Sequence, residues 1–221
     1  KVVYQRRSRD RHEHAVETLR ASGRAFDCGC SRSDLPDSGV YPGTCRSGLA
    51  AGRAARSVRF RVPADPIRVV DAVFGARQVD LERDCGDFVI RRADGLIAYQ
   101  LAVVVDDAAQ AVTEVVRGAD LLDSTPRQQA LFEALGLPLP RWMHLPVVVD
   151  RKGRKLSKSR GDDPLAPGRE REALVTALTA LGHAPPTGVR SLESVWKWAR
   201  KEWNPDRIPT EPFEAGVVTR G

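Results

Sequence analysis

The sequence predicts an α/β fold, because segments with the pattern of strands alternate with segments that have the pattern of amphipathic helices. Short apolar runs such as "HLPVVVD", residues 144–150, are typical of buried strands. Longer segments such as "REREALVTALTALG", residues 169–182, carry apolar residues at helical spacing. A chain of 221 residues can bury a substantial core, as one large domain or two small ones.

The N-terminal part predicts a helix, a turn-rich segment and a strand. Residues 10–22 carry apolar side chains on one face and charges on the other and are followed by Gly23, which predicts an amphipathic helix. Residues 27–46 contain too many glycines, prolines and cysteines for regular structure. Alternation of side-chain character over 55–62 predicts a strand.

A β-hairpin is predicted over residues 87–107, with its turn at the Asp-Gly pair 94–95. The continuous apolar run 101–105 predicts a buried strand after this turn. Asp106 and Asp107 end that strand, at the position where ligand crevices form in α/β proteins. Two roles stay open for them: they orient a ligand or RNA, or they cap the next helix.

The C-terminal half predicts three helices and one buried strand. Thr125 is expected to cap a helix over 126–136 that begins with a proline. The buried strand follows over 144–150. Two further helices are predicted over 169–182 and over 191–203, the second capped by its first residue, a serine.

The composition excludes several classes of protein. With 42% hydrophobic and 29% charged residues, the chain is typical of a globular protein and not of a disordered one. No apolar run approaches the roughly 20 residues that span a bilayer, and residues 1–14 contain no signal-peptide core. We therefore expect a cytoplasmic protein without a membrane partner. The net charge of +6 favours a polyanionic partner.

The segment "RKGRKLSKSR", residues 151–160, contains six basic residues, two serines and a glycine. One interpretation is a solvated basic loop. The other is a phosphate clamp, in which lysines act as mobile point charges and serine hydroxyls and turn amides donate hydrogen bonds. His144, which begins the preceding strand, is assigned a structural role and not a catalytic one.

Three of the four cysteines lie close together in the sequence, at Cys28, Cys30 and Cys45. Clustered cysteines in a cytoplasmic chain favour a metal site over a disulfide. Tetrahedral zinc requires a fourth ligand, and Cys85 lies too far along the chain to be an obvious one. The candidates inside the segment are Asp27, Asp34, Asp37 and Tyr41. The alternative is three unrelated thiols in a turn-rich loop.

Taken together, three segments resemble the glutamyl-Q tRNA(Asp) synthetase family, truncated relatives of the class I glutamyl-tRNA synthetases. These segments are "CGC…VYPGTCR", "DFVIRRADGLIAYQLAVVVDDAAQAVTEVVRGADLLDSTPRQ" and "HLPVVVDRKGRKLSKS". The similarity runs from about residue 3 to about residue 159, in the expected order and spacing. It implies an incomplete Rossmann-type catalytic domain with a zinc-bearing insertion and a helical C-terminal region.

The resemblance also implies a division of the chain into four segments. They are 1–26, part of the nucleotide-binding fold; 27–98, the zinc-bearing insertion on the tRNA acceptor side; 99–160, the second half of the catalytic fold with the basic loop; and 161–221, the helical C-terminal region.

The family's site residues carry over to matching positions of this chain. The run "KLSKS" resembles the KMSKS loop that closes over ATP, with Leu in place of Met, which implies that Lys158 and then Lys155 stabilise the phosphates. The glutamate pocket of the family implies Tyr99 and Arg117 as glutamate ligands. Without the family, Tyr99 reads as a core aromatic residue and Arg117 as a surface arginine.

The zinc ion of the family is held by three cysteines and a tyrosine oxygen, which match Cys28, Cys30, Tyr41 and Cys45. Zinc in such a site is structural, because four protein ligands leave no position for a catalytic water. The resemblance thus implies a tyrosine as the fourth ligand, which spacing alone does not select.

The implied activity is ATP-dependent activation of glutamate and its transfer to queuosine in the anticodon of tRNA(Asp). The implied partners are this tRNA, glutamate and ATP with Mg²⁺, and a monomer is expected. The family begins with an HIGH-type motif upstream of the matched residues, so the 221 residues alone are expected to be inactive. The alternatives are a fragment of a glutamyl-tRNA synthetase that charges the tRNA 3′ end, and a non-catalytic zinc-containing RNA-binding module.

Overall fold

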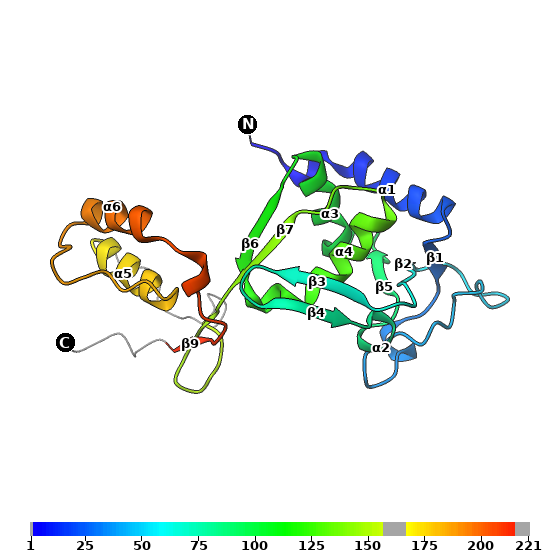
Figure 1. Ribbon diagram of the computed structural model, residues 1–221. Coiled ribbons are helices and arrows are strands. Elements are labelled where there is room, and N and C mark those ends of the chain that lie inside the picture. Colours follow the sequence, from blue (N-terminus) through cyan, green and yellow to red (C-terminus); the bar gives the residue numbers. More distant parts are fainter. Residues whose placement is uncertain (1, 157–166, 215–221) are drawn as a thin grey trace. The chain divides into compact units, whose positions relative to one another are not determined.

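The computed structural model describes residues 2–156 and 167–214 (Figure 1). The chain divides into two compact units, and each is described by itself. Unit 1 consists of Lys1–Val70, Ala76–Val115 and Asp123–Arg141, and unit 2 of Asp71–Gly75, Val116–Leu122 and Trp142–Gly221.

An antiparallel three-stranded sheet forms one layer of unit 1. Its strands are β1 (Ala25–Cys28), β2 (Ser57–Phe60) and β5 (Phe88–Arg91), in the order β1-β2-β5. The strand predicted over 55–62 is therefore confirmed. Phe60 of β2 and Phe88 of β5 pack with ring centroids 5.3 Å apart, so the sheet contributes directly to the core.

Three helices pack together in unit 1: α1 (Arg9–Ala21), α3 (Tyr99–Ala109) and α4 (Thr125–Ala134). Helix α1 confirms the prediction over 10–22. It buries Val16 and Leu19 completely, as its apolar face predicts.

The strand predicted over 101–105 is wrong, because this run lies within helix α3. The preceding turn at 94–95 is confirmed: the amide of Arg92 donates to the carbonyl of Leu96, and Gly95 has the positive φ that this turn requires. The apolar run 101–105 is buried on nearly all sides. A helix and a strand that are buried in this way have the same apolar pattern.

Asp106 lies within helix α3, so it does not end a strand as predicted and does not cap the next helix. Its carboxylate contacts His12 Nε2 at 2.8 Å and accepts a hydrogen bond from Gln5 Nε2 at 3.0 Å. Both partners lie before or within α1. Asp106 therefore joins helix α3 to the N-terminal segment, and Asp107 lies next to it on the same helix.

Helix α4 begins one residue earlier than predicted. Its N-cap is Ser124, and Thr125 is fully buried as a helical residue, so Thr125 does not cap the helix. Pro126 lies in the first turn, where the missing amide proton removes no helical hydrogen bond. The remaining elements that begin in or span unit 1 are η1 (Gln5–Arg7), η2 (Arg32–Asp34), α2 (Leu81–Asp84), η3 (Ala119–Ser124) and the neighbouring strands β3 (Ile67–Asp71) and β4 (Gly75–Val79).

The strand predicted over 144–150 is divided into β7 (Arg141–Leu145) and β8 (Val148–Val149). Pro146 lies between them, and proline has no amide proton for a ladder hydrogen bond, so the strand is interrupted there.

In unit 2, β7 neighbours β6 (Glu114–Gly118). Asp71, the last residue of β3, pairs with Trp142 of β7 in parallel. Strand β8 pairs in parallel with β9 (Phe213–Glu214). Strand β7 thus lies between β3 and β6 in the sheet.

Helices α5 (Glu170–Ala180) and α6 (Leu192–Glu202) pack together in unit 2 (Figure 1). Both confirm the predicted helices 169–182 and 191–203. Ser191 caps α6 by accepting a hydrogen bond from the amide of Ser194, as predicted. Leu178, Val195 and Ala199 form the buried contact between the two helices. The short helix η5 (Pro205–Arg207) follows.

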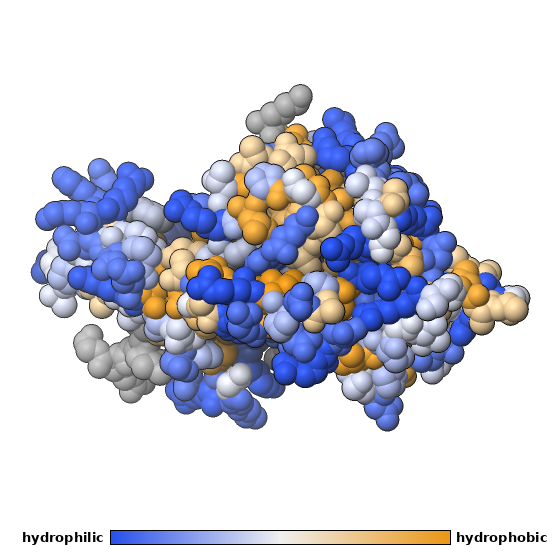
Figure 2. All heavy atoms as spheres, turned by 45° about the vertical axis from the view of Figure 1, so that its right-hand side comes forward, coloured by the Kyte–Doolittle hydropathy of each residue, from blue (hydrophilic) through white to orange (hydrophobic). Residues whose placement is uncertain are grey.

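Among the described residues, no helix is long and apolar enough to cross a membrane. Hydrophilic side chains cover most of the face shown in Figure 2, with apolar patches between them. This surface agrees with the high content of charged residues.

Candidate functional site

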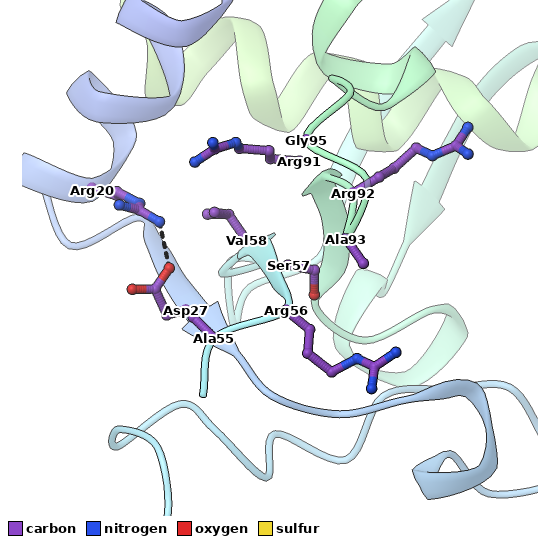
Figure 3. A pocket seen from close by; sticks show the side chains of 10 residues that line it. All are labelled: Arg20, Asp27, Ala55, Arg56, Ser57, Val58, Arg91, Arg92, Ala93 and Gly95. Atoms are coloured by element: carbon purple, nitrogen blue, oxygen red, sulfur yellow. Dashed lines mark hydrogen bonds and ion pairs between the residues drawn. The ribbon is translucent and has the colours of Figure 1, made fainter. Parts of the chain in front are cut away.

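A pocket of about 210 Å³ lies beside β1, β2 and β5 and is lined by several arginines (Figure 3). These arginines are Arg20, Arg56, Arg91 and Arg92. Three of them have carboxylate partners, in the pairs Arg20–Asp27, Arg91–Glu13 and Arg92–Asp94. These carboxylates offset part of the positive charge around the pocket.

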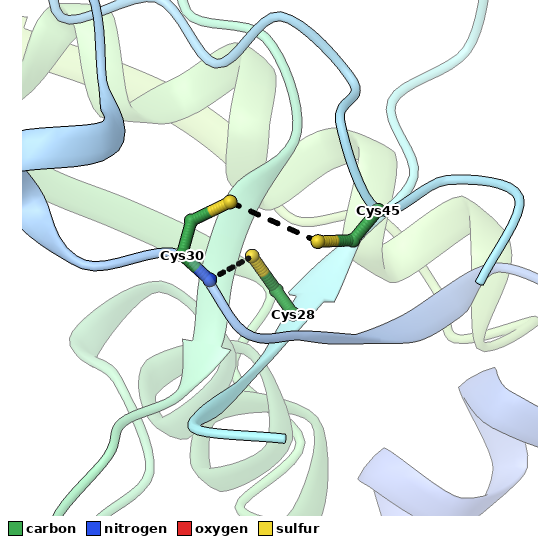
Figure 4. Close-up of side chains that lie close together, drawn as sticks. All are labelled: Cys28, Cys30 and Cys45. Atoms are coloured by element: carbon green, nitrogen blue, oxygen red, sulfur yellow. Dashed lines mark hydrogen bonds between the residues drawn. The ribbon is translucent and has the colours of Figure 1, made fainter. Parts of the chain in front are cut away.

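The three clustered cysteines converge in unit 1 (Figure 4). The sulfur atoms of Cys28, Cys30 and Cys45 lie within 4.8 Å of one another, and all three side chains are buried. The sulfurs of Cys30 and Cys45 are 3.7 Å apart. Two thiolates on one tetrahedral zinc ion, with Zn–S bonds of about 2.3 Å, lie about 3.8 Å apart. The cluster thus has the donor set and the spacing for zinc.

Tyr41 lies beside the three cysteines. Its phenol oxygen lies 3.6 Å from the sulfur of Cys28 and accepts a hydrogen bond from the amide of Cys45 at 2.7 Å. Gly86 makes room for this segment, because a Cβ at that position would lie 2.4 Å from the carbonyl oxygen of Tyr41. Tyr41 is buried with the three cysteines in one apolar cluster.

The competing aspartates have other surroundings. Asp27 is paired with Arg20, and Asp34 is exposed and bonded to Ser31 and Arg53. Asp37 is exposed. The positions of these carboxylates favour Tyr41 as the fourth group of the cluster.

The pKa values of the thiols in the cluster are shifted in opposite directions. Burial raises the pKa of the Cys28 thiol, but hydrogen bonding with Tyr41, the Cys30 amide and Arg59 outweighs burial and lowers it to about 7. Burial and the neighbouring sulfurs raise the pKa of Cys30 to about 11. Burial also raises the pKa of Tyr41. Because metal ligands bind in their deprotonated form, a divalent cation would stabilise the thiolates that burial disfavours.

Arg59 is a member of this site that the sequence prediction missed. It lies on β2, is buried, and donates from Nε to the Cys28 sulfur at 3.2 Å. Its guanidinium lies 3.9 Å from the centre of the Tyr41 ring, and its Nη1 donates to the carbonyl of Asp87. Its guanidinium would offset the negative charge of thiolates at this site. Its strand alternates in side-chain character, and no sequence signal marks its inward orientation.

Cys85 lies outside the cluster, as predicted. It is partly buried, and its sulfur lies within hydrogen-bonding distance of the carbonyl oxygens of Leu81 and Gly86, at 3.4 and 3.3 Å. The structure therefore separates one ordinary thiol from the three that could hold a metal.

The described part of the basic loop forms a tight hairpin in unit 2. The amide of Leu156 donates to the carbonyl of Val148, and Asp150 accepts hydrogen bonds from the amides of Lys152 and Arg154. Lys155 forms an ion pair with Asp120. Its ammonium is thus held beside the end of β6, and not freely solvated. Lys158 lies outside the described residues.

Arg117, on β6, is held on several sides by groups of unit 2. Its Nε donates to His144 Nε2 at 3.0 Å, and its Nη2 donates to the carbonyl of Leu121 at 3.4 Å. The guanidinium lies 5.4 Å from the centre of the Trp142 ring. The alternative of an ordinary surface arginine does not fit these contacts. They orient a planar cation that can bind a carboxylate through two hydrogen bonds.

Tyr99 is the first residue of α3 in unit 1, and it is 51% exposed. The strand position expected for it is therefore wrong, and so is the alternative of a core aromatic residue. Its phenol is accessible from solvent, as a ligand-binding group requires.

Comparison with known proteins identifies several relatives. Residues 42–195 match the family described as tRNA synthetases class I (E and Q), catalytic domain. The chain is 46% identical to the glutamyl-Q tRNA(Asp) synthetase of Chromobacterium violaceum over 96% of this chain and 74% of that protein. It is 46% identical to that of Geobacter sulfurreducens over 97% of this chain and 74% of the relative.

Solved structures agree with the fold. The glutamate-tRNA synthetase of Elizabethkingia anophelis superimposes with a TM-score of 0.74 at 21% identity, over 96% of this chain. This chain spans 52% of that structure. The similarity is to the class I synthetase catalytic fold.

Proposed function

Because the chain belongs to the glutamyl-Q tRNA(Asp) synthetase family, we propose that it takes part in the ATP-dependent glutamylation of queuosine in tRNA(Asp). The single observation that carries this proposal is the 46% identity over nearly the whole chain to two such enzymes. In the first step, a glutamate carboxylate oxygen attacks the α-phosphorus of ATP and pyrophosphate leaves. In the second, a nucleophilic group of queuosine attacks the acyl carbon and AMP leaves.

Arg117 is the proposed ligand of a glutamate carboxylate, and Tyr99 a second glutamate ligand. A guanidinium presents parallel N–H donors that match the two oxygens of a carboxylate. The contacts with His144, Leu121 and Trp142 support this role, because they limit the orientations that Arg117 can adopt before glutamate binds.

The lysines of "KLSKS" are the proposed ATP contacts, with Lys158 first and Lys155 second. Charge develops on the pyrophosphate as it leaves, and a lysine placed there stabilises it. Lys155 contacts Asp120 in the structure. A contact between Lys155 and the phosphates of ATP would therefore replace the ion pair between Lys155 and Asp120.

Zinc is the proposed structural metal, held by Cys28, Cys30, Tyr41 and Cys45. The convergence of these four side chains in a buried cluster supports the assignment. Such an ion would crosslink a turn-rich segment that has little regular structure of its own. The remaining inferences, namely ATP with Mg²⁺, a monomer, a cytoplasmic location and the four-segment division, stay predictions.

The zinc assignment predicts the metal content of ligand variants. Cys45→Ser is expected to abolish retention of about one zinc ion per chain, because a hydroxyl is a much poorer zinc ligand than a thiolate. Tyr41→Phe is expected to weaken retention, since three thiolates remain. Metal content after dialysis against a mild chelator measures both effects. Cys85→Ser is the matched control and should retain zinc fully. Full retention by the double variant Cys28→Ser/Cys30→Ser would refute the site.

The proposed activity is tested with tRNA(Asp) in three forms: complete, lacking queuosine, and lacking the 3′-terminal adenosine. The full-length protein is expected to attach labelled glutamate to the complete tRNA and to the form without the terminal adenosine. It should not label the form without queuosine. Labelling that requires the terminal adenosine would instead indicate ordinary tRNA charging. Binding of tRNA without any glutamate-dependent ATP–pyrophosphate exchange would indicate a non-catalytic module.

A further inference from the structure

The buried carboxylate of Asp71 is linked to Arg117 through His144, and the proposed reaction assigns it no role. Asp71 is the last residue of β3 and is almost completely buried. One oxygen accepts hydrogen bonds from the amides of Val73 and Phe74, at 3.0 and 2.9 Å. The other accepts from the amide of His144 at 3.1 Å and contacts its Nδ1 at 2.6 Å. Asp71 is thus held rigidly by backbone amides while it binds the imidazole.

Asp71 determines which nitrogen of His144 carries the proton. Burial raises the pKa of the Asp71 carboxyl, but the hydrogen bonds from Phe74, His144 and Val73 lower it below its usual range. An ionised carboxylate only accepts hydrogen bonds, so Nδ1 of His144 must be the donor. The opposite nitrogen, Nε2, then carries the lone pair that accepts from Arg117 Nε at 3.0 Å. The other neutral tautomer would place two N–H donors against each other.

The three side chains lie on three neighbouring strands. Asp71 ends β3, His144 lies on β7 and Arg117 lies on β6, and β7 is the strand between the other two. His144 is 0% exposed, so its imidazole makes no direct contact with solvent. Trp142, two residues before His144 on β7, packs near the Arg117 guanidinium. The strand β7 therefore supplies both an acceptor and an aromatic surface for one arginine.

We propose that Asp71 and His144 are positioning residues that orient Arg117 for glutamate. The inference rests on the proposed role of Arg117 as a glutamate ligand. Asp71 selects the tautomer of His144, and His144 fixes the Nε end of the guanidinium. These contacts restrict the orientations of the Arg117 guanidinium before glutamate arrives. Less side-chain conformational entropy is therefore lost when glutamate binds. This role of His144 is more specific than the structural role expected from the sequence.

Two amide substitutions of His144 separate positioning from packing. In His144→Gln the amide oxygen reaches the place of Nε2 and can accept from Arg117. In His144→Asn the amide reaches only the place of Nδ1 and can donate to Asp71, without reaching Arg117. We expect His144→Asn to raise the glutamate KM of ATP–pyrophosphate exchange about tenfold or more, the scale of misplacing a binding group. His144→Gln should restore much of the loss, and the ATP KM should stay near that of the wild type in both.

The outcomes distinguish this inference from the proposed function. If Arg117→Ala leaves the glutamate KM unchanged, Arg117 is not a glutamate ligand, and both proposals fail. If Arg117→Ala raises the glutamate KM but neither His144 variant does, only the positioning role fails. Equal impairment of His144→Asn and His144→Gln would show that His144 acts through packing, which also overturns the inference.

A measurement on the unmodified protein keeps the inference testable if the variants fail to fold. Long-range ¹H–¹⁵N NMR spectra of the imidazole rings report which nitrogen carries the proton. We expect His144 to show a protonated Nδ1 and an unprotonated Nε2 at neutral pH. A ring protonated at Nε2, alone or at both nitrogens, would contradict the hydrogen bond to Arg117.

Discussion

Replacing Arg117 with alanine in the full-length protein is expected to raise the glutamate concentration required for ATP–pyrophosphate exchange far more than the ATP concentration. The substitution removes a charged, partly buried partner of the substrate carboxylate, and such a loss costs about 2–5 kcal/mol. Each 1.4 kcal/mol is a factor of about ten, so the glutamate KM should rise at least about thirtyfold. Steady-state exchange with each substrate varied in turn measures the effect.

Two further variants make this prediction specific. Arg141→Ala removes an arginine that is 83% exposed and paired with Glu114, and it should change the glutamate KM little. Arg117→Lys keeps the charge but loses the planar donor fork, and it should lie between wild type and Arg117→Ala. A glutamate requirement that is the same in Arg117→Ala as in the wild type would remove Arg117 from the pocket.

Replacing Lys158 with alanine is expected to lower the rate of glutamyl-adenylate formation by about two to three orders of magnitude, the scale of losing one pre-organised donor. The position is proposed from its match to the KMSKS loop. The charge on the leaving pyrophosphate is greatest in the transition state, so ground-state ATP affinity should fall much less. Single-turnover adenylate formation, together with an ATP-binding titration, separates the two quantities.

Lys152→Ala is the matched control for this loop. Lys152 is exposed at the turn of the basic hairpin, where its charge is screened by solvent. Its removal should leave both the rate and the ATP affinity nearly unchanged. Equal losses for Lys152→Ala and Lys158→Ala, or a loss confined to binding, would reduce the segment to a solvated basic loop.

Most helices could be predicted from the sequence, because their amphipathic pattern and end signals are local. The helices at 10–22, 169–182 and 191–203 are all confirmed. The apolar run 101–105 predicts a strand, but it is helical, since a run that is apolar on all sides has no period that distinguishes a strand from a helix. The run 144–150 predicts a single strand, but the structure divides it into β7 and β8 on either side of Pro146.

The sequence predicts three members of the candidate metal site but does not select the fourth. The three cysteines could be grouped from their spacing, because clustered cysteines in a chain that is expected to be cytoplasmic favour a metal site over a disulfide. The fourth group could not be chosen by spacing, since a phenol and three carboxylates were equally near in sequence. Folding places Tyr41 against Cys28 and Cys45 and leaves the carboxylates of Asp34 and Asp37 exposed.

The sequence by itself determined the α/β class, the family and the cysteine cluster, because these depend on local periodicity and on rare residue types at short spacing. The tertiary structure alone decided that Arg59 lies against Cys28 and that Asp71, His144 and Arg117 form one chain of hydrogen bonds. Asp71 and His144 are separated by 73 positions, and no periodic pattern links residues so far apart. Strand pairing brings them together, and only then does the ionised carboxylate select the imidazole tautomer that can hold the arginine.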